Sequence, residues 1–237
     1  MSNQDFRNII LALFAGIFLA FLLETTNQNN IDSSLKEVVH DTVLVSGECP
    51  KIVLNKKALL IGDSHSAFAR GWQTFITDWT GLEIKNTAVE GKTTSWMKVK
   101  LVQNIDSTFE YCFIFGGGND AASSIPPDEI FKNIEQMVDI CIEFGVKPVV
   151  IIGTSTEKVL KSSSGQWKEY ARIKTEYQNL LITDLRRATI VDTRDLIERS
   201  DCADFLCHME ISGHKKVAAK IIHDMDFYRI EENKIYN

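Results

Sequence analysis

Short runs of apolar and β-branched residues alternate along the chain with longer stretches of helical periodicity. The runs predict five strands, at 58–61, 82–85, 111–115, 148–152 and 189–191. Amphipathic helices are predicted by apolar residues three and four positions apart, at 130–144, 167–181 and 213–225. Continuous apolar strands that alternate with helices are typical of a parallel sheet covered on both faces. The predicted fold class is therefore α/β, a three-layer α/β/α sandwich with a parallel sheet of about five strands.

The N-terminus carries a different pattern, an unbroken apolar run from Ile9 to Leu23. As a helix rising about 1.5 Å per residue, this run would be roughly 22 Å long, against about 30 Å for a bilayer core. Length alone therefore leaves a membrane anchor and a cleaved signal peptide open. A cleavable signal normally ends in small residues, and Phe21 to Thr26 holds no such pair, so we favour an uncleaved signal anchor. A buried core helix would normally keep a polar stripe, which this run lacks.

These patterns divide the chain into three predicted segments. They are an N-terminal signal anchor or transmembrane segment over 1–24, a polar extracytoplasmic tether over 25–50 and a globular domain over 51–237. Arg7 precedes the apolar run and Glu24 follows it, so the positive-inside rule places the domain outside the cytoplasm. We therefore expect a single-pass, membrane-anchored protein with a periplasmic or extracellular domain.

Composition narrows the possible partners and cofactors. The net charge is -6 and the basic residues are scattered, which argues against nucleic-acid binding. The cysteines are odd in number, 5, and form no C-x-x-C pair, so we expect no zinc site, no other metal and no cofactor. Cys112 and Cys141 lie in apolar segments, as packed thiols do. Outside the cell, Cys202 and Cys207 could bridge a loop.

Two polar stretches follow predicted strands and carry candidate chemistry. Gly62 to Ser66 follows the first strand and places Ser64 at a strand-to-helix turn, where it can act as a nucleophile if a base reaches it. Turns and helix N-caps also use Asp and Ser for structural reasons, so this stretch alone decides nothing. Gly116 to Asp120 follows the third strand and brings the Asn119 amide to the same edge. Such a preorganised donor can stabilise an oxyanion.

A histidine near the C-terminus is the candidate base. His208 lies in a loop before the last predicted helix and faces the same edge of the sheet, so it is a plausible general base. The other histidines are weaker candidates and are better explained by structural roles. His40 lies in the tether, His223 lies in the last helix, and His65 lies beside the serine.

Taken in order, these stretches resemble the SGNH hydrolases, the GDSL-like lipase and esterase family. That family has a G-D-S start, an N-x-x-x-x-G stretch, a G-x-N-D stretch and a late D-x-x-H-x-x-x-x-G-H segment. The corresponding residues here are Gly62-Asp63-Ser64, Asn86 to Gly91, Gly117 to Asp120, and His208 with Gly213-His214. The resemblance spans Ala58 to about Ile222, and four motifs in the right order are far more specific than any one of them.

The resemblance implies a flavodoxin-like SGNH fold and a set of roles. Ser64 would be the nucleophile and His208 the base. The backbone N–H groups of Ser64 and Gly91 and the side-chain amide of Asn119 would form the oxyanion hole.

The chain departs from the family at the triad acid. The family's acid lies three residues before the histidine, where this chain has Phe205. Three alternatives follow: a one-residue bulge lets Asp204 orient the imidazole, Asp201 does so, or a Ser-His dyad works with a backbone carbonyl. We favour Asp204.

The expected activity is hydrolysis of carboxylic esters. An extracytoplasmic, acidic domain without a long hydrophobic lid favours O-acetyl or O-acyl groups on cell-surface glycans over lipids. Transfer of the acyl group to a sugar hydroxyl would use the same site. A non-catalytic, membrane-tethered glycan-binding or assembly module is the competing interpretation, motivated by the displaced acid and the Asn-rich tether.

Overall fold

A computed structural model describes residues 56–155, 165–204 and 208–227 of the chain. The predicted anchor and tether lie outside these residues, and the expected domain boundaries stay predictions. One parallel sheet has the strand order β2-β1-β3-β4-β5. Its strands are β1 (Lys57–Gly62), β2 (Glu83–Asn86), β3 (Tyr111–Phe115), β4 (Lys147–Ile152) and β5 (Thr189–Asp192).

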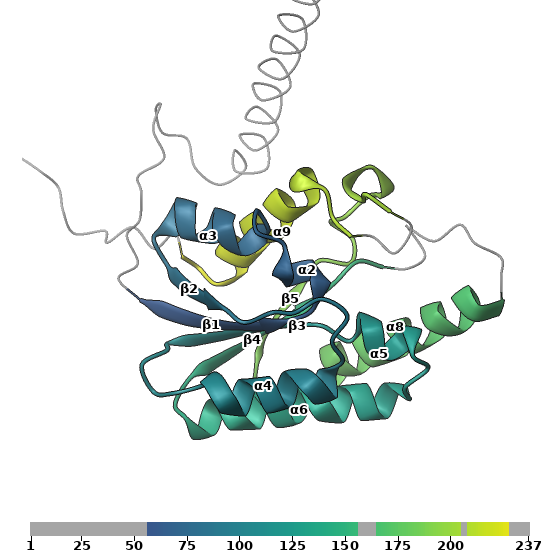
Figure 1. The fold of residues 1–237 in the computed structure, drawn as a ribbon, viewed down its shortest axis with the longest axis horizontal. Helices are drawn as coiled ribbons and strands as arrows, with labels where there is room; N and C mark the ends of the chain where they lie inside the picture. The colour runs from purple at the N-terminus through teal and green to yellow at the C-terminus, as the bar shows by residue number, and fades with distance from the viewer. Residues whose placement is uncertain (1–55, 156–164, 205–207, 228–237) are drawn as a thin grey trace, which may run out of the picture. The chain divides into compact units, whose positions relative to one another are not determined.

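Helices cover both faces of this sheet, as Figure 1 shows. One layer contains α3 (Trp72–Thr80) and α9 (Ile211–Asp224). The other contains α4 (Thr94–Asn104), α6 (Pro127–Glu143) and α8 (Gly165–Thr183). Three short helices lie at the ends of strands or in loops: α2 (Ser64–Ala67), α5 (Gly118–Ala122) and the 3-10 helix η1 (Arg199–Asp201).

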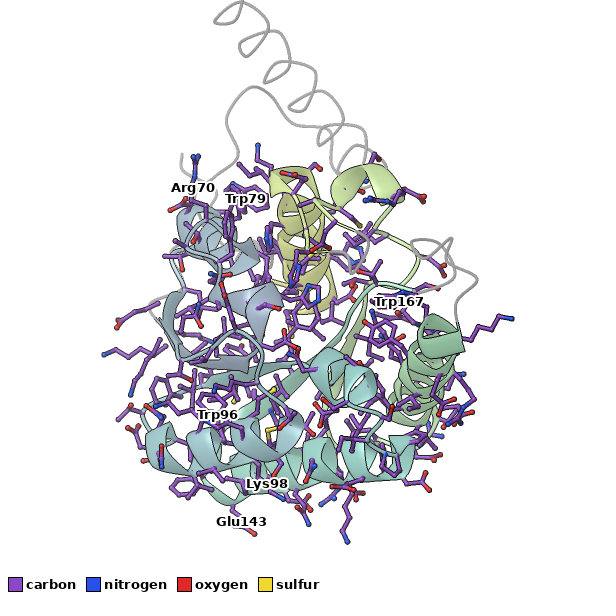
Figure 2. All side chains as sticks on the ribbon, turned by 45° about the vertical axis from the view of Figure 1, so that its right-hand side comes forward. Arg70, Trp79, Trp96, Lys98, Glu143 and Trp167 are labelled. Carbon is purple, nitrogen blue, oxygen red and sulfur yellow. The ribbon has the colours of Figure 1, made fainter. Side chains whose placement is uncertain are left out.

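The inner strands are apolar throughout because the sheet is buried on both sides. In β1, Leu59 and Ile61 pack under α4 and α6, whereas Ala58 and Leu60 pack under α3 and α9. All four side chains are fully buried. Side chains fill the space between the sheet and both helix layers (Figure 2). Alternate residues of one strand therefore hold two helix layers together.

Polar contacts join neighbouring helices outside the core. Lys98 on α4, labelled in Figure 2, donates to Asn133 Oδ1 and Gln136 Oε1 on α6, at 3.0 and 2.6 Å. The other face of α4 is unusual, because Val99 and Val102 are exposed. Exposed valines break the regular spacing of apolar residues that predicts an amphipathic helix. We did not predict α4 from the sequence, and we did not predict α3 either.

The α/β fold class and the parallel sheet of five strands are confirmed. The five predicted strands and three predicted helices are all present, with ends that differ by up to three residues. Within the described residues, no helix combines the length and apolarity needed to cross a membrane. The run from Ile9 to Leu23 lies outside them, so the predicted anchor stays a prediction.

Candidate active site

Ser64 stands where β1 ends and α2 begins. Asp63 is the N-cap of this short helix, and its Oδ1 accepts the backbone N–H of His65 at 3.0 Å. Such a cap satisfies one of the free N–H groups at a helix start. The strand fixes one side of Ser64 and the cap fixes the other, so the hydroxyl is held at the carboxyl edge of the sheet.

The structure brings Ser64, His208 and Asp204 into one hydrogen-bonded line. Ser64 Oγ lies 3.0 Å from His208 Nε2, and His208 Nδ1 lies 2.5 Å from Asp204 Oδ2. Because a carboxylate only accepts, Nδ1 carries the proton and donates it to Asp204. Nε2 is then the acceptor for the serine O–H. This is the tautomer that a general base for Ser64 requires.

Local backbone pairing explains how the displaced acid reaches the histidine. Cys202 and Met209 form an antiparallel bridge, and Ala203 N–H donates to the His208 carbonyl at 2.7 Å. This register puts Asp204 next to His208. Its Oδ1 accepts the His208 backbone N–H at 3.0 Å, while Oδ2 accepts the ring. Phe205, the position of the family's acid, lies outside the described residues.

Asp201, the alternative acid, forms its hydrogen bonds with groups other than His208. Its carboxylate accepts from Lys216 Nζ at 2.6 Å, from Ser212 Oγ at 2.8 Å and from the Glu198 backbone N–H at 3.0 Å. Burial opposes but does not outweigh these donors, which hold the pKa of Asp201 below its ordinary value. Asp201 therefore ties η1 to the start of α9 and does not contact the base.

The three predicted oxyanion donors come from separate segments: Ser64 starts α2, Gly91 lies in the turn after β2, and Asn119 lies in α5. Asn119 Nδ2 donates to the Lys92 carbonyl at 3.1 Å, which joins α5 to the turn that contains Gly91. A second contact, to Asp63 Oδ2, is 3.4 Å long and weaker than an ordinary hydrogen bond. Gly91 has φ +70, a conformation that L side chains rarely adopt, so glycine is favoured there. The amide hydrogen on the longer contact is the one we expect to be available to an oxyanion.

Two further motif residues support the loops. Asn86 donates from Nδ2 to the Ser66 carbonyl at 2.7 Å and so ties the end of β2 to α2. His214 is buried, and its Nδ1 accepts the Trp72 backbone N–H at 3.3 Å. Burial lowers the pKa of His214 to about 4, so its imidazole is neutral and suited to this acceptor role.

His65, the histidine next to Ser64, contacts the candidate base. Its ring stacks with that of Phe115, at 5.4 Å between centroids, and with that of His208, at 5.6 Å. Burial, with the nearby charge of Lys174, lowers the pKa of His65 to about 3. The ring therefore stays neutral and buttresses the candidate base without adding charge. His223, the histidine of the last helix, is exposed and pairs with Asp224. His40 lies outside the described residues.

A small pocket beside the serine holds buried charges that we did not predict. Asp63, His65 and Lys174 line it together with the backbone of the glycine loop after β3. Lys174 belongs to α8, which packs closely on that loop: a Cβ on Gly117, whose φ is +103, would lie 2.8 Å from the Tyr177 ring. The sequence held one signal, because Lys174 falls on the buried stripe of α8 between Tyr170 and Tyr177.

The described cysteines are all buried. Cys112 and Cys141 are free thiols, as expected for packed residues. Cys202 takes part in a disulfide whose second cysteine lies outside the described residues, so the Cys202–Cys207 pairing stays a prediction. Among residues 56–155, 165–204 and 208–227, no three or more His, Cys, Asp or Glu side chains form a metal-binding group.

Comparisons with known proteins bear on the fold. No protein-family model and no curated protein matches the sequence. Among solved structures, a lipolytic protein of the G-D-S-L family from Veillonella parvula is similar, with a TM-score of 0.57, 15% identity, and coverage of 73% of this chain and 99% of that one. The acetylxylan esterase Axe2 from Geobacillus stearothermophilus has a TM-score of 0.56 at 15% identity, with coverage of 74% of this chain and 96% of that one.

A third similar structure is LAE5, an alpha/beta hydrolase enzyme from the metagenome of Lake Arreo in Spain. Its TM-score is 0.60 at 12% identity, with coverage of 74% of this chain and 97% of that one. These matches span nearly the full length of the solved domains. The fold of this chain is therefore that of the SGNH hydrolases, as the motif order predicts.

The contacts of Asp201 generate a prediction about stability. Asp201→Asn should lower the free energy of unfolding by about 1–3 kcal/mol, because it removes an acceptor charge from three buried or half-buried donors. The pKa of Asp201 is lower in the folded protein than in the unfolded chain, so its contribution is present above about pH 3.9 and is lost as pH falls through the folded pKa. Urea titrations at pH 7 and pH 3 measure the difference.

The control for this substitution is Asp78→Asn on the exposed side of α3, which should change stability by less than about 0.5 kcal/mol. Equal stability of Asp201→Asn and the wild-type protein at pH 7 would contradict the anchoring role of Asp201.

Proposed function

We propose that this chain is an SGNH-type serine esterase that hydrolyses carboxylic esters. One observation carries the proposal: Ser64, His208 and Asp204 form a hydrogen-bonded line at the catalytic edge of an SGNH fold. Three independently positioned groups with the tautomer of a general base are the arrangement that activates a serine hydroxyl.

The reaction has two halves. Ser64 Oγ attacks the ester carbonyl carbon while its proton passes to His208 Nε2, and the carbonyl oxygen becomes an oxyanion. The N–H groups of Ser64 and Gly91 and the Asn119 amide donate hydrogen bonds to that oxyanion. Nε2 then protonates the departing alcohol, which leaves an acyl-serine. A water molecule, deprotonated by His208, attacks the acyl-serine and releases the carboxylic acid.

The substrate class that we propose is an O-acetyl or small O-acyl ester on a glycan. One of the similar solved structures is an acetylxylan esterase, an enzyme named for an O-acetylated glycan. Transfer of the acyl group to a sugar hydroxyl is the second candidate activity, since an acyl-serine can be attacked by either acceptor. A non-catalytic glycan-binding module is less well supported, because Asp204 does reach His208.

The decisive experiment compares Ser64→Ala with the wild-type domain. The wild-type domain should hydrolyse p-nitrophenyl acetate and be labelled by a fluorophosphonate probe, and Ser64→Ala should lose both. Because β1 and the Asp63 cap hold the turn without the serine hydroxyl, the variant should keep its melting temperature. A folded wild-type domain that is inert to the ester and to the probe would favour the non-catalytic module.

The choice of acid gives the next prediction. Asp204→Asn should lower kcat by up to about 10⁴-fold, because an amide beside Nδ1 favours the wrong imidazole tautomer. Asp201→Asn is the matched control and should keep most of its kcat wherever it remains folded. A large loss of kcat at Asp201 with little at Asp204 would transfer the role, and full activity in both would support the Ser-His dyad.

We also propose that the domain is held outside the cytoplasmic membrane by an uncleaved anchor within residues 1–24. The support is the apolar run from Ile9 to Leu23 and the order of charges around it. The intact protein should stay in the membrane fraction, with its domain open to protease from the non-cytoplasmic side. Release of a mature form lacking residues 1–23 would identify a cleaved signal peptide instead.

A further inference from the structure

A buried lysine faces the Asp63 carboxylate across the small pocket beside the serine. Lys174 is only 6% exposed, and Asp63 is 1% exposed. Both line the pocket, together with His65 and the backbone of Gly116 and Gly153. Within the described residues Lys174 forms no ion pair at 4.0 Å or less, and its ammonium lies over the Tyr170 ring, 5.6 Å from the centroid. An ammonium buried in this way is costly unless a nearby negative charge offsets it.

Asp63 is the group that supplies this charge. Several titratable groups surround its carboxylate: Lys174, Tyr170 and Tyr177 on α8, His65 on α2, Asp120 on α5, and His208 in the loop before α9. The tyrosines and His65 are neutral at pH 7, and Asp120 opposes ionisation of Asp63. His208 must be neutral to act as a base. Lys174 is therefore the group in this set that supplies positive charge at pH 7.

Two acceptors lie beside the Asn119 amide, the Lys92 carbonyl at 3.1 Å and Asp63 Oδ2 at 3.4 Å, and only Asp63 can change its protonation state. An ionised Asp63 only accepts, so it favours the Asn119 amide with its NH₂ group toward Asp63 and the Lys92 carbonyl. A protonated Asp63 can donate to the amide oxygen instead, which opposes the preference that the Lys92 carbonyl imposes and raises the population of the flipped amide. The flipped amide presents an acceptor where the oxyanion needs a donor.

We propose that Lys174 is a positioning residue for catalysis: it keeps Asp63 ionised across the pocket, and the ionised Asp63, together with the Lys92 carbonyl, holds the Asn119 amide in its donor orientation. This inference rests on the proposed esterase function. Burial raises the pKa of Asp63 to about 6, against the opposing effects of the His65 N–H and of Lys174. Burial likewise lowers the pKa of Lys174 to about 8, against the effect of Asp63. Each group thus favours the charged form of the other.

The test is the pH profile of p-nitrophenyl acetate hydrolysis by Lys174→Met, which keeps the length of the side chain and removes its charge. We expect kcat at pH 7 to fall roughly ten-fold, less than the roughly 10²–10³-fold effect of deleting an oxyanion donor, with little change in KM. The acid limb of the kcat profile should move up by about one pH unit, because the pKa of Asp63 rises without the lysine. Lys168→Met, an exposed lysine on the same helix, should match the wild-type profile.

A double-mutant cycle separates this role from a general packing effect. In an Asp63→Asn background the side chain at position 63 is a neutral amide that cannot ionise. Adding Lys174→Met should then change kcat by less than about two-fold. Full additivity of the two substitutions would overturn the proposal. An unshifted acid limb would also overturn it, and a loss confined to KM would make Lys174 a substrate-contact residue instead.

A titration that needs no activity keeps this inference separate from the proposed function. The ¹³C carboxyl resonance of Asp63, assigned by its loss in Asp63→Asn, should report an ionised group at pH 7 in the wild-type domain and a higher midpoint in Lys174→Met. An inert wild-type domain with this shift would refute the esterase and keep the Lys174–Asp63 coupling. A wild-type Asp63 that is protonated at pH 7 would refute the coupling whether or not the variant folds.

Discussion

The geometry of the candidate site depends on one carboxylate that is buried where β1 becomes α2. Asp63 caps the helix that begins at Ser64, contacts the Asn119 amide, and faces the ammonium of Lys174. A buried carboxylate is costly, so each of these neighbours must stay in place to offset the cost. The nucleophile and the oxyanion donor are therefore held by the same charge, and a change in that charge would affect both.

Much of the fold could be predicted because the sheet is buried on both faces. Strands such as 111–115 consist of apolar residues alone, and α6 repeats its buried residues with helical spacing. The α4 helix escaped prediction because Val99 and Val102 face solvent and its buried face is narrow. Side-chain polarity predicts burial, and the pattern fails where an apolar residue is exposed.

The candidate site divides in a similar way. Ser64, Asn119 and His208 follow strands or precede a helix in the family's order, so sequence places them at one edge of the sheet. The reach of Asp204 depends on the pairing of Cys202 with Met209, which is a long-range backbone register that no local pattern reveals. Lys174 was missed because a lysine in a helix is ordinarily solvated, although its position on the apolar stripe marks it as buried.

The two aspartates of the site act in different surroundings, and this decides how each can act. The side chains of Asp204 and His208 are 38% and 45% exposed, so solvent screens their charges and the direct hydrogen bond must fix the tautomer. Asp63 and Lys174 are shielded from solvent, where charges interact strongly without direct contact. An acid that orients the base can therefore be displaced by one residue if the hydrogen bond survives. A buried charge that orients the oxyanion donor requires only its counter-charge nearby, and that counter-charge comes from a helix outside the four motifs.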